Sequence, residues 1–542
     1  MVTSQRNEAL VETIARAADT NDLARATRLA HEAFAQGVEH PLLLSLRGTE
    51  HRDAGRLAES LSDLRRAHFL DPRDLTILNG TGLTLLEMEK GEEALRCFDQ
   101  ALAIDPMFDH GWVNRGWALQ WLGRGAEASQ SYERAIQINP ENGHALARLA
   151  ALASKRGDRT TALELAQRAR AMRPGQPDAE LILAEIGLSD PAASETKLRE
   201  MLARGLAPAH RAHALSLLAD TLDALDQAAE AFAAYVEANN LFRQINAARF
   251  ETPDGPNMGK ALVFLNEWAE ALDPADWVDR ADGAEGGVGE IGHVFLMGFS
   301  RSGTTLIESV LGAHPDVVHL EERDTLRAAA LAFLDRHGDL AGLVRASERN
   351  LQGLRDDYWS RVRGFGVDPV GKVFIDKGPF STPRLGVIRR LFPKAKILFA
   401  VRDPRDVVLS SFRRRFRMNP TTFALLDLKD TAELYAATMK FADTLRGKVV
   451  IDEYMLFYEH LIADFDSEAR AICDFVGVPW RDDLIDFARR AKQGDVNSAS
   501  SDQIARGLYT DKTSHWRRYR EQLAPVMPIL QPWVDRFGYS PE

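Results

Sequence analysis

Apolar and small residues recur at a fixed spacing along the first half of the chain. When the sequence is written in blocks of 34 residues from Pro41, four consecutive blocks share the same columns. Each block opens on an apolar residue, carries small residues four positions later and near its end, and closes on a proline. The four columns are Leu44, Leu78, Trp112 and Leu146; Gly48, Gly82, Gly116 and Ala150; Ala67, Ala101, Ala135 and Ala169; and Pro72, Pro106, Pro140 and Pro174. Such self-similarity predicts a repeat array.

Each block is expected to form two helices joined by a turn. Small residues at matched positions let two helices approach closely, and the closing proline ends the second helix because it has no N–H group to donate. Weaker copies at residues 9–40, 177–210 and about 212–245 extend the array to six or seven repeats over residues 1–250. The pattern resembles the tetratricopeptide repeat, which implies an α-helical superhelix with a concave groove. That groove can bind a protein or peptide partner, or the array can be a packing scaffold, and the repeats favour neither.

The pattern changes after residue 250. Residues 251–290 are rich in Gly, Pro and Asp, which predicts a linker, with a short helix over residues 261–272. Over residues 291–542 the apolar runs HVFLMGF, AKILFAVRD and KVVIDEYMLF predict strands, another short strand ends at Lys377, and helical stretches lie between them. Strands that alternate with helices predict a parallel α/β sheet of the P-loop-like kind. In that class, ligands bind at the carboxyl ends of the strands.

Composition and charge narrow the function classes. The chain has 542 residues, 45% of them hydrophobic, which is enough material for two cores. A net charge of −12 argues against a general nucleic-acid partner. Cys97 and Cys473 lie in different halves without neighbours at metal-ligand spacing, so we expect neither a disulfide nor a zinc site. Because no apolar leader and no run of 18 apolar residues occurs, we expect no signal peptide, no membrane span and a cytoplasmic protein.

The segment GFSRSGTTLI, from Gly298 to Ile307, follows a predicted strand and opens a predicted helix. Its glycines permit a tight turn in which backbone N–H groups and the helix dipole face an anion. Thr304 and Thr305 add hydroxyl donors, and Arg301 adds a forked cation suited to phosphate or sulfate. A Walker A loop demands a lysine where Thr304 stands, which argues against an ATPase or kinase.

This loop resembles the 5′-phosphosulfate-binding loop of sulfotransferases that use 3′-phosphoadenosine 5′-phosphosulfate (PAPS). The resemblance implies that PAPS is the co-substrate and that the loop binds it. The residues concerned are Arg301, Ser302, Gly303, Thr304 and Thr305.

A second segment, ILFAVRDPRDVVLSSF, resembles the family's 3′-phosphate-binding strand and helix. It implies that Arg402, and Ser410 eight residues later, bind the 3′-phosphate, with Arg414 one helical turn further on the same face as another ligand. In the third segment, Tyr458 aligns with a tyrosine that contacts the nucleotide. In a fourth, Ser500 loosely matches the loop that closes over the cofactor.

Sulfuryl transfer needs a base for the acceptor hydroxyl and cations for the developing charge. The run AHPDVVHLEERD resembles tyrosylprotein sulfotransferases, which implies that Glu322 is the base. Glu321 is the neighbouring alternative, and His319 a weaker one. By the same resemblance, Lys377 stabilises the leaving group and Arg301 clamps the sulfuryl oxygens, and no metal is required.

The sequence thus predicts a repeat array in front of a PAPS-dependent sulfotransferase. Protein tyrosine is the acceptor that the Glu322 segment favours, although a glycan, lipid or small-molecule hydroxyl stays open. The alternative is a scaffold that binds nucleotide without catalysis, which the intact Arg402, Ser410, Lys377 and Glu322 argue against. The basic run RRRFR at residues 413–417 is expected to be a solvated surface, with attraction of an acidic substrate as the less favoured alternative.

Overall fold

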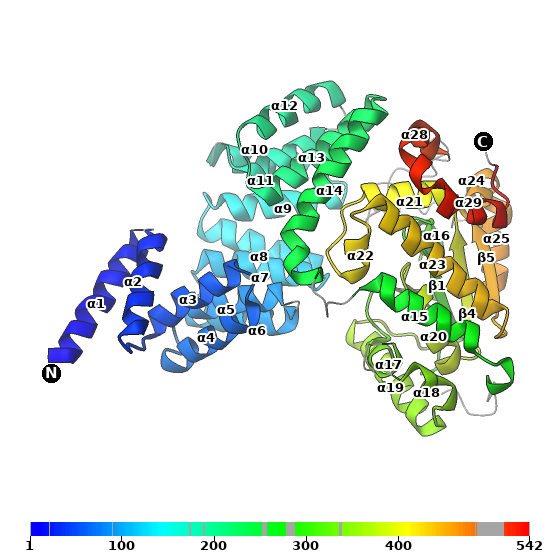
Figure 1. Cartoon of the computed structure of the whole chain (residues 1–542), viewed down its shortest axis with the longest axis horizontal. Coiled ribbons are helices and arrows are strands. Elements are labelled where there is room, and N and C mark those ends of the chain that lie inside the picture. The colour runs from blue at the N-terminus through cyan, green and yellow to red at the C-terminus, as the bar shows by residue number, and fades with distance from the viewer. Residues whose placement is uncertain are drawn as a thin grey trace. The chain divides into compact units, whose positions relative to one another are not determined.

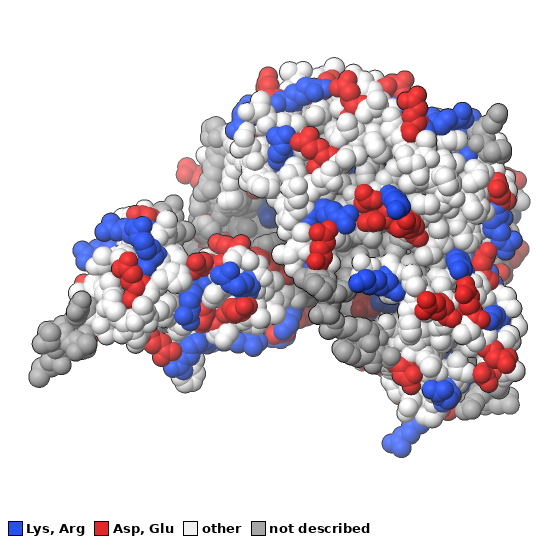
Figure 2. All heavy atoms as spheres, in the orientation of Figure 1, with Lys and Arg blue, Asp and Glu red and all other residues white. Residues whose placement is uncertain are grey.

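The chain forms two compact units, Met1–Ile186 and Gly187–Glu542, which we describe one at a time. The computed structural model (Figure 1) describes residues 2–20, 22–88, 90–172, 175–187, 190–251, 257–277, 288–334, 339–482, 484 and 514–540. No helix in these ranges is both long and apolar enough to cross a membrane. On the face shown in Figure 2, basic and acidic side chains are interspersed, in keeping with a surface whose net charge of −12 is spread out.

The first unit is built from helices that follow the predicted blocks. Its described helices are α1 (Val2–Asp19), α2 (Leu23–Ala35), α3 (Pro41–Asp53), α4 (Leu57–Leu70), α5 (Leu75–Glu87), α6 (Gly91–Ile104), α7 (Asp109–Trp121), α8 (Gly125–Ile138), α9 (Gly143–Lys155), α10 (Arg159–Met172) and α11 (Pro177–Ile186). Two helices per block confirm the predicted helix–turn–helix repeat.

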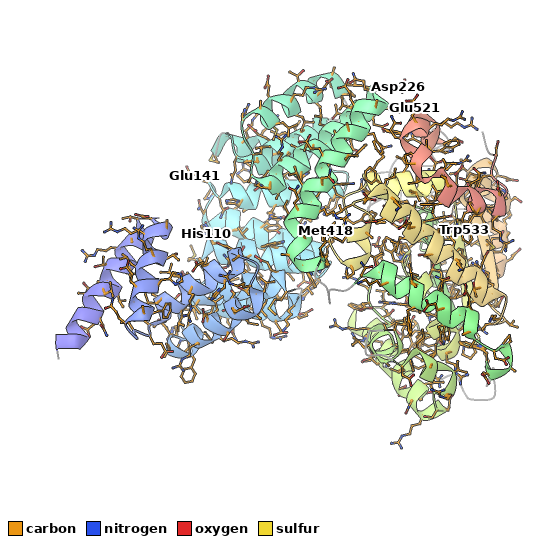
Figure 3. The ribbon with its side chains drawn as sticks, in the orientation of Figure 1. His110, Glu141, Asp226, Met418, Glu521 and Trp533 are labelled. Atoms are coloured by element: carbon orange, nitrogen blue, oxygen red, sulfur yellow. The ribbon has the colours of Figure 1, made fainter. Side chains whose placement is uncertain are left out.

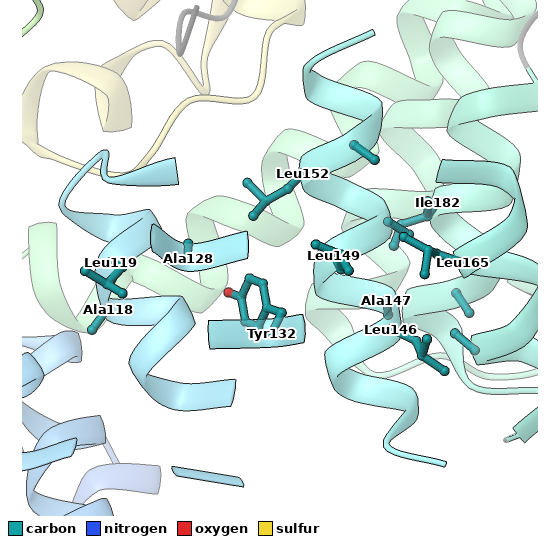
Figure 4. Packing of buried hydrophobic residues seen from close by; sticks show 14 of the residues in the cluster. Ala118, Leu119, Ala128, Tyr132, Leu146, Ala147, Leu149, Leu152, Leu165 and Ile182 are labelled. Carbon is teal, nitrogen blue, oxygen red and sulfur yellow. The ribbon is translucent and has the colours of Figure 1, made fainter. Parts of the chain in front are cut away.

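Close helix packing explains the small residues of the repeat. A Cβ atom added to Gly82 of α5 would lie 2.5 Å from Cε1 of Phe98 in α6, and one added to Gly116 of α7 would lie 2.5 Å from Cε1 of Tyr132 in α8. Since real side chains do not tolerate such distances, only glycine lets these aromatic rings fill the space between the two helices. Figure 4 shows Tyr132 among the alanine and leucine side chains that continue this core from repeat to repeat.

The second unit is built around a parallel sheet. Its described strands are β1 (Gly292–Gly298), β2 (Val317–Glu321), β3 (Val373–Lys377), β4 (Lys396–Val401) and β5 (Glu453–Phe457), in the order β2-β3-β1-β4-β5. The predicted α/β class is confirmed. Strand β2 was not predicted, and the predicted strand from Lys448 begins only at Glu453, because α23 extends to Arg446 and residues 447–452 form the turn between them.

Helices cover both faces of the sheet (Figure 1). The described helices of the second unit are α12 (Pro191–Ala203), α13 (Pro208–Ala224), α14 (Ala228–Phe250), α15 (Met258–Ala271), η2 (Pro274–Asp276), α16 (Thr304–Leu311), α17 (Arg327–Phe333), α18 (Leu340–Arg345), α19 (Glu348–Gly364), η3 (Thr382–Arg384), α20 (Leu385–Leu391), α21 (Pro404–Arg413), α22 (Pro420–Ala424), α23 (Leu428–Arg446), α24 (Tyr458–Ala463), α25 (Phe465–Val476), η5 (His515–Tyr519), α28 (Arg520–Leu523), η6 (Ala524–Val526) and α29 (Met527–Arg536). The predicted bridging helix is α15, in which Asn266 donates to the Ala437 carbonyl of α23 at 3.0 Å.

Alternation along the strands divides the core into two layers. Leu296 and Ile375 pack with Ile307 of α16 and Ile472 of α25 on one face. On the other face, Phe295 belongs to a group of aromatic rings from α19 and the end of α20. The sheet is therefore buried on both sides, as parallel sheets require.

Helices α13 and α14 belong to the compact unit that contains the sheet, although the repeat pattern assigns them to the array. The boundary between the two compact units follows packing, whereas the predicted boundaries at residues 250 and 290 follow the repeat pattern and composition of the sequence. Those divisions therefore remain predictions.

Candidate active site

The loop between β1 and α16 lies at the carboxyl edge of the sheet. The last residue of β1, Gly298, has φ +152°, and a Cβ there would lie 2.4 Å from the Ala400 carbonyl oxygen of β4. At Gly303 φ is +96°, and a Cβ would lie 2.5 Å from Cδ2 of Tyr458. Both positions demand glycine, because the backbone runs directly against its neighbours. The loop is therefore a tight turn with no side chain at these two positions, and it leads directly into the first N–H groups of α16.

Arg301 connects this loop to α21. Its backbone is in the left-handed region with φ 72°, which is uncommon for a residue with a side chain. Its Nε donates to Oγ of Ser410 at 3.0 Å. The loop and the helix after β4, which are separated by about a hundred residues in sequence, therefore meet through the two residues that the sequence singled out.

Two further predicted residues stand beside this contact. Arg402 donates from Nη1 to the Arg301 carbonyl at 3.4 Å, and its guanidinium lies 4.7 Å from the centre of the Tyr458 ring. The pKa of Arg301 is lowered to about 9, first by burial and then by the positive charges of Arg414 and Arg402. Like charges gathered in this way favour an anion. Ser302, Thr304 and Thr305 complete the loop as buried residues.

The helical argument for Arg414 is wrong. Helix α21 ends at Arg413, and Arg414 is its C-cap with an extended backbone, φ −89° and ψ 133°. It therefore does not continue the face of Ser410. The chain leaves the helix there, yet the Arg414 guanidinium stays close enough to Arg301 to lower its pKa.

Lys377 ends β3 and is fully buried among three carboxylates. Its Nζ lies 2.8 Å from Oε1 of Glu322, 3.2 Å from Oε2 of Glu308 and 3.4 Å from Oε1 of Glu321. Burial alone would lower the pKa of Lys377, but the carboxylates of Glu308, Glu322 and Glu321 outweigh it and raise the pKa above its ordinary value. The lysine is therefore a fixed cation at the end of the strand.

The three carboxylates differ in access to solvent. The side chain of Glu322 is 48% exposed, that of Glu321 is 20% exposed and that of Glu308 is 3% exposed. Glu322 also has a left-handed backbone with φ 46°, and its N–H donates to the Lys377 carbonyl at 2.9 Å. Such strain persists where the surrounding structure holds it, frequently at functional sites. Glu322 is the carboxylate that a molecule from solvent can reach.

Glu308 is a member of the cluster that sequence reasoning missed. It lies in α16, the helix that the loop opens. Its Oε1 lies 2.9 Å from Nδ1 of His319. Burial lowers the pKa of His319, but the hydrogen bond to Glu308 outweighs burial and raises the pKa above its ordinary value. The available signal was a charged residue inside the mostly apolar stretch LIESVL.

Behind the cluster, a buried network supports the end of β3. Asp376 accepts hydrogen bonds from Oγ1 of Thr325 at 2.7 Å and from the Tyr358 hydroxyl at 2.8 Å. The Tyr358 oxygen lies 2.8 Å from Nε2 of His293. Burial raises the pKa of Asp376 to about 6 and lowers the pKa of His293 to about 3. Thr325 follows the strand that carries Glu321, so this network also fixes the loop of Glu322.

Ser500 and Arg413 differ from the predicted residues described above. Ser500 lies outside the described residues. Arg413, the first residue of the basic run, is mostly buried, and its Nη2 lies 2.5 Å from Oδ2 of Asp223 in α13. Among the described residues, no group of three or more His, Cys, Asp or Glu side chains is placed to hold a metal ion.

Comparison with known proteins places families on both parts of the chain. Residues 293–482 match the model of the sulfotransferase family, and residues 45–107 and 110–142 match tetratricopeptide repeat models. Both resemblances predicted from the sequence are confirmed.

Individual relatives cover the C-terminal half or the repeats. An uncharacterized protein of Aquifex aeolicus is 28% identical over 251 residues, which are 44% of this chain and 32% of that protein. Protein-tyrosine sulfotransferase A of Caenorhabditis elegans is 26% identical over 276 residues, 46% of this chain and 67% of that protein. Among solved structures, a tetratricopeptide repeat protein from Parabacteroides merdae has 20% identity and a TM-score of 0.36, covering 44% of this chain and 93% of that one. The first of these matches spans about a third of the Aquifex protein.

Proposed function

We propose, from the sulfotransferase-family domain at residues 293–482, that this chain transfers a sulfuryl group from PAPS to an acceptor hydroxyl. The hydrogen bond from Arg301 to Ser410 carries the proposal. It joins a loop that resembles a 5′-phosphosulfate site to a helix that resembles a 3′-phosphate site. A nucleotide with phosphates at both ends of its ribose has the chemistry that such a pair of sites would recognise.

The residues at this edge of the sheet fit such a donor. At Gly303 the backbone packs directly against the Tyr458 ring, where a Cβ atom would clash, so the turn presents backbone and not a side chain. The guanidinium groups of Arg301, Arg402 and Arg414 supply the positive charge, and Ser410 supplies a hydroxyl. Arginine suits phosphate and sulfate because its planar fork can donate two parallel hydrogen bonds. The bound donor supplies the sulfuryl group, and the protein positions it.

Glu322 is proposed as the base. It is the most exposed of the three carboxylates around Lys377, so an acceptor hydroxyl can approach it from solvent. Its carboxylate would take the proton from that hydroxyl as the new S–O bond forms. Glu321 is less exposed. His319 is a poorer base, since its hydrogen bond to Glu308 favours the protonated imidazole.

Lys377 and Arg301 are proposed to stabilise the charge that develops during transfer. A buried lysine whose charge is held by carboxylates is a preorganised cation, and its ammonium would face the bridging oxygen of the leaving phosphate. The Arg301 guanidinium, fixed by Ser410, would hold the sulfuryl oxygens. Little covalent chemistry falls to the protein in such a transfer, so these positions supply most of the catalysis.

Protein tyrosine is the acceptor that we propose. The support is the name of a relative, protein-tyrosine sulfotransferase A of Caenorhabditis elegans, which aligns with the C-terminal half. The tetratricopeptide repeats are proposed to bind a protein, either the acceptor or a separate partner. In the first unit, Asp99, Trp112, Arg115 and Arg134 line a hollow where a peptide could lie.

The test is transfer of labelled sulfate from PAPS to a panel of acceptors: a tyrosine peptide, an oligosaccharide and a small phenol. Glu322→Gln is expected to lower kcat about a hundredfold or more while donor affinity is kept. Glu433→Gln, which changes an exposed glutamate of α23, is the control and keeps full rate. Transfer to the oligosaccharide alone would remove the tyrosine assignment. Tight nucleotide binding without turnover on any acceptor would favour the scaffold.

A further inference from the structure

Helices α13 and α14 contact the end of α21, and Asp223 is the carboxylate at this contact. Asp223, near the end of α13, is 14% exposed and lies against donors from two elements, α21 and η5. The Tyr519 hydroxyl donates to its Oδ1 at 2.6 Å, Nη2 of Arg413 lies 2.5 Å from its Oδ2, and Nε2 of His515 lies 3.2 Å from its Oδ1. Burial would raise the pKa of Asp223, but these partners hold it below its ordinary range. The carboxylate is therefore charged and fully engaged.

The partners of Asp223 belong to the structure around the predicted phosphate ligands. Arg413 is the last residue of α21, three positions after Ser410 and directly before Arg414. Its guanidinium lies 4.9 Å from the centre of the Tyr235 ring of α14. Because the Arg413 charge is buried, its position depends on the carboxylate that pairs with it.

A second set of contacts fixes the same end of α21. Nδ2 of Asn239 in α14 donates to the backbone carbonyl of Phe412 at 2.9 Å. The Phe232 ring of α14 stacks on the Phe412 ring with 5.4 Å between centroids. A backbone carbonyl at the end of a helix has no partner within the helix, so Asn239 supplies the one it needs. Both contacts come from α14, a helix that the repeat pattern assigns to the array.

Residues 514–519 contact both α21 and α13. The N–H groups of Ser514 and Trp516 donate to the Asp406 carboxylate of α21 at 2.9 and 2.8 Å. On the other side, His515 and Tyr519 reach Asp223. Asp223 of α13 thus contacts both α21 and η5.

We propose that α13 and α14 are a part of the nucleotide-binding machinery and that Asp223 is a positioning residue, which holds the end of α21 so that Ser410 and Arg414 face the 3′-phosphate of the donor. The inference rests on the proposed function for the identity of the ligand. It assigns a role in the donor site to the last helix pair of the array, which the family match at residues 293–482 does not reach.

Asp223→Ala and Asp223→Asn in the full chain test the proposal, with Asp226→Asn as the matched control. Asp226 lies in the turn after α13, is 86% exposed and pairs with Arg518, and its positive φ of 63° suits asparagine. Figure 3 shows Asp226 at the tip of the α13–α14 hairpin, beside the segment that carries Glu521. The control therefore changes a carboxylate of the same hairpin without touching α21.

The first measurement is hydrogen exchange of α21 without ligand. Asp223→Ala is expected to speed exchange of residues 406–414 at least about tenfold, whereas Asp226→Asn leaves it unchanged. If α21 exchanges at the wild-type rate in both Asp223 variants, the proposal is overturned. This outcome does not depend on what the site binds. Tyr519→Phe, which removes one neutral donor, should show a smaller effect and guards against misfolding of the stronger variant.

The second measurement is calorimetric affinity for 3′-phosphoadenosine 5′-phosphate and for adenosine 5′-phosphate, which lacks the 3′-phosphate. Asp223→Asn is expected to weaken the first about tenfold and leave the second unchanged. Equal loss for both nucleotides would indicate general unfolding and contradict the positioning role. If wild-type protein binds neither nucleotide, the proposed function fails, while the exchange result still decides the role of Asp223 in holding α21.

Discussion

At the scale of single residues, the end of β3 depends on a buried lysine that three carboxylates surround. Lys377 is fully buried, and one carboxylate would suffice to compensate it, yet three lie within 3.4 Å. The buried one, Glu308, pairs with both Lys377 and His319. The carboxylates therefore have different roles: Glu308 keeps the lysine charged and in place, and this leaves Glu322 available to an acceptor.

This division predicts coupling between Lys377 and Glu308. Lys377→Met should cost about 3 to 5 kcal/mol of unfolding free energy, because it leaves a carboxylate buried without its main partner. Glu308→Gln should cost less, since Lys377 keeps Glu321 and Glu322. The double variant should be more stable than the sum of the single effects predicts, by at least about 1 kcal/mol, in urea unfolding. Additive effects would show that the pair does not act as a unit.

The buried histidine of β1 gives a prediction about pH. The folded pKa of His293 is lowered by burial to about 3, whereas an unfolded histidine titrates near its ordinary value. Above pH ~6.5 both states are neutral, and as pH falls below that value only the unfolded state gains the proton. Stability is therefore lost as pH falls from about 6.5 towards 3, and His293→Phe should lack that loss.

The measurement is the difference in unfolding free energy between wild type and His293→Phe at two pH values. It should shift by about 2 to 3 kcal/mol against the wild type between pH ~6.5 and ~4.5. Asp376 works in the opposite sense over part of this window, because its raised pKa of about 6 favours the folded state at low pH. Because wild type and His293→Phe both contain Asp376, the difference in their unfolding free energies reduces the contribution of Asp376. A constant difference would mean that His293 is not held neutral.

At the scale of elements, the junctions at the carboxyl edge of the sheet decide the geometry. Strand β1 ends at a glycine that lies directly against β4, and α16 begins after a second glycine that lies against Tyr458. These junctions put the loop, the end of β3 and the start of α21 at one edge. The sequence already indicated this edge, because its motifs follow apolar runs, and parallel strands place their ends together.

Gly298→Ala tests the first junction. At φ +152° and with the Ala400 carbonyl 2.4 Å from the new Cβ, the backbone of β1 and β4 must separate. We expect a loss of about 2 to 4 kcal/mol in unfolding free energy, measured by urea denaturation. Gly353→Ala is the control, since it lies in α19 with open space around it and should stabilise the protein by up to about 1 kcal/mol. A Gly298→Ala protein as stable as wild type would contradict the packing described here.

The elements that could not be predicted show the limits of local pattern. Strand β2 is short and its residues do not form a continuous apolar run, so nothing local separated it from a loop. Arg414 was placed on a helix face because the periodicity of α21 gave no sign of its end at Arg413. Glu308 and Asp223 gain their roles only from partners far away in sequence. The motifs themselves could be predicted, because each lies in one continuous stretch.

At the scale of the whole molecule, two divisions compete. The repeat pattern ends near residue 250, but the second compact unit begins at Gly187 and includes α12 to α14. Phe250 of α14 packs on Phe423 of α22, with 5.1 Å between ring centroids. Arg243 also pairs with Asp430 of α23 at 3.2 Å. A boundary drawn by packing therefore lies earlier than a boundary drawn by repeats.

Two deletions distinguish the divisions. A chain without residues 1–186 should fold, because the second unit keeps its core, and should retain nucleotide affinity within about twofold. A chain without residues 1–250 exposes Phe412 and leaves the buried Arg413 charge without Asp223, so it should aggregate or lose affinity at least about tenfold. Size-exclusion chromatography and calorimetry report the two properties. Equal behaviour of both deletions would favour the boundary near residue 250.

The β1–α16 loop and α21 are proposed to form the donor site together. Titration of 3′-phosphoadenosine 5′-phosphate into the full chain by calorimetry tests this proposal most directly, with Ser410→Ala and the exposed control Glu433→Gln alongside. We predict one site per chain, affinity lowered about tenfold in Ser410→Ala, and no change in Glu433→Gln. Absence of binding to the wild-type chain, or equal affinity in Ser410→Ala and wild type, would contradict the account.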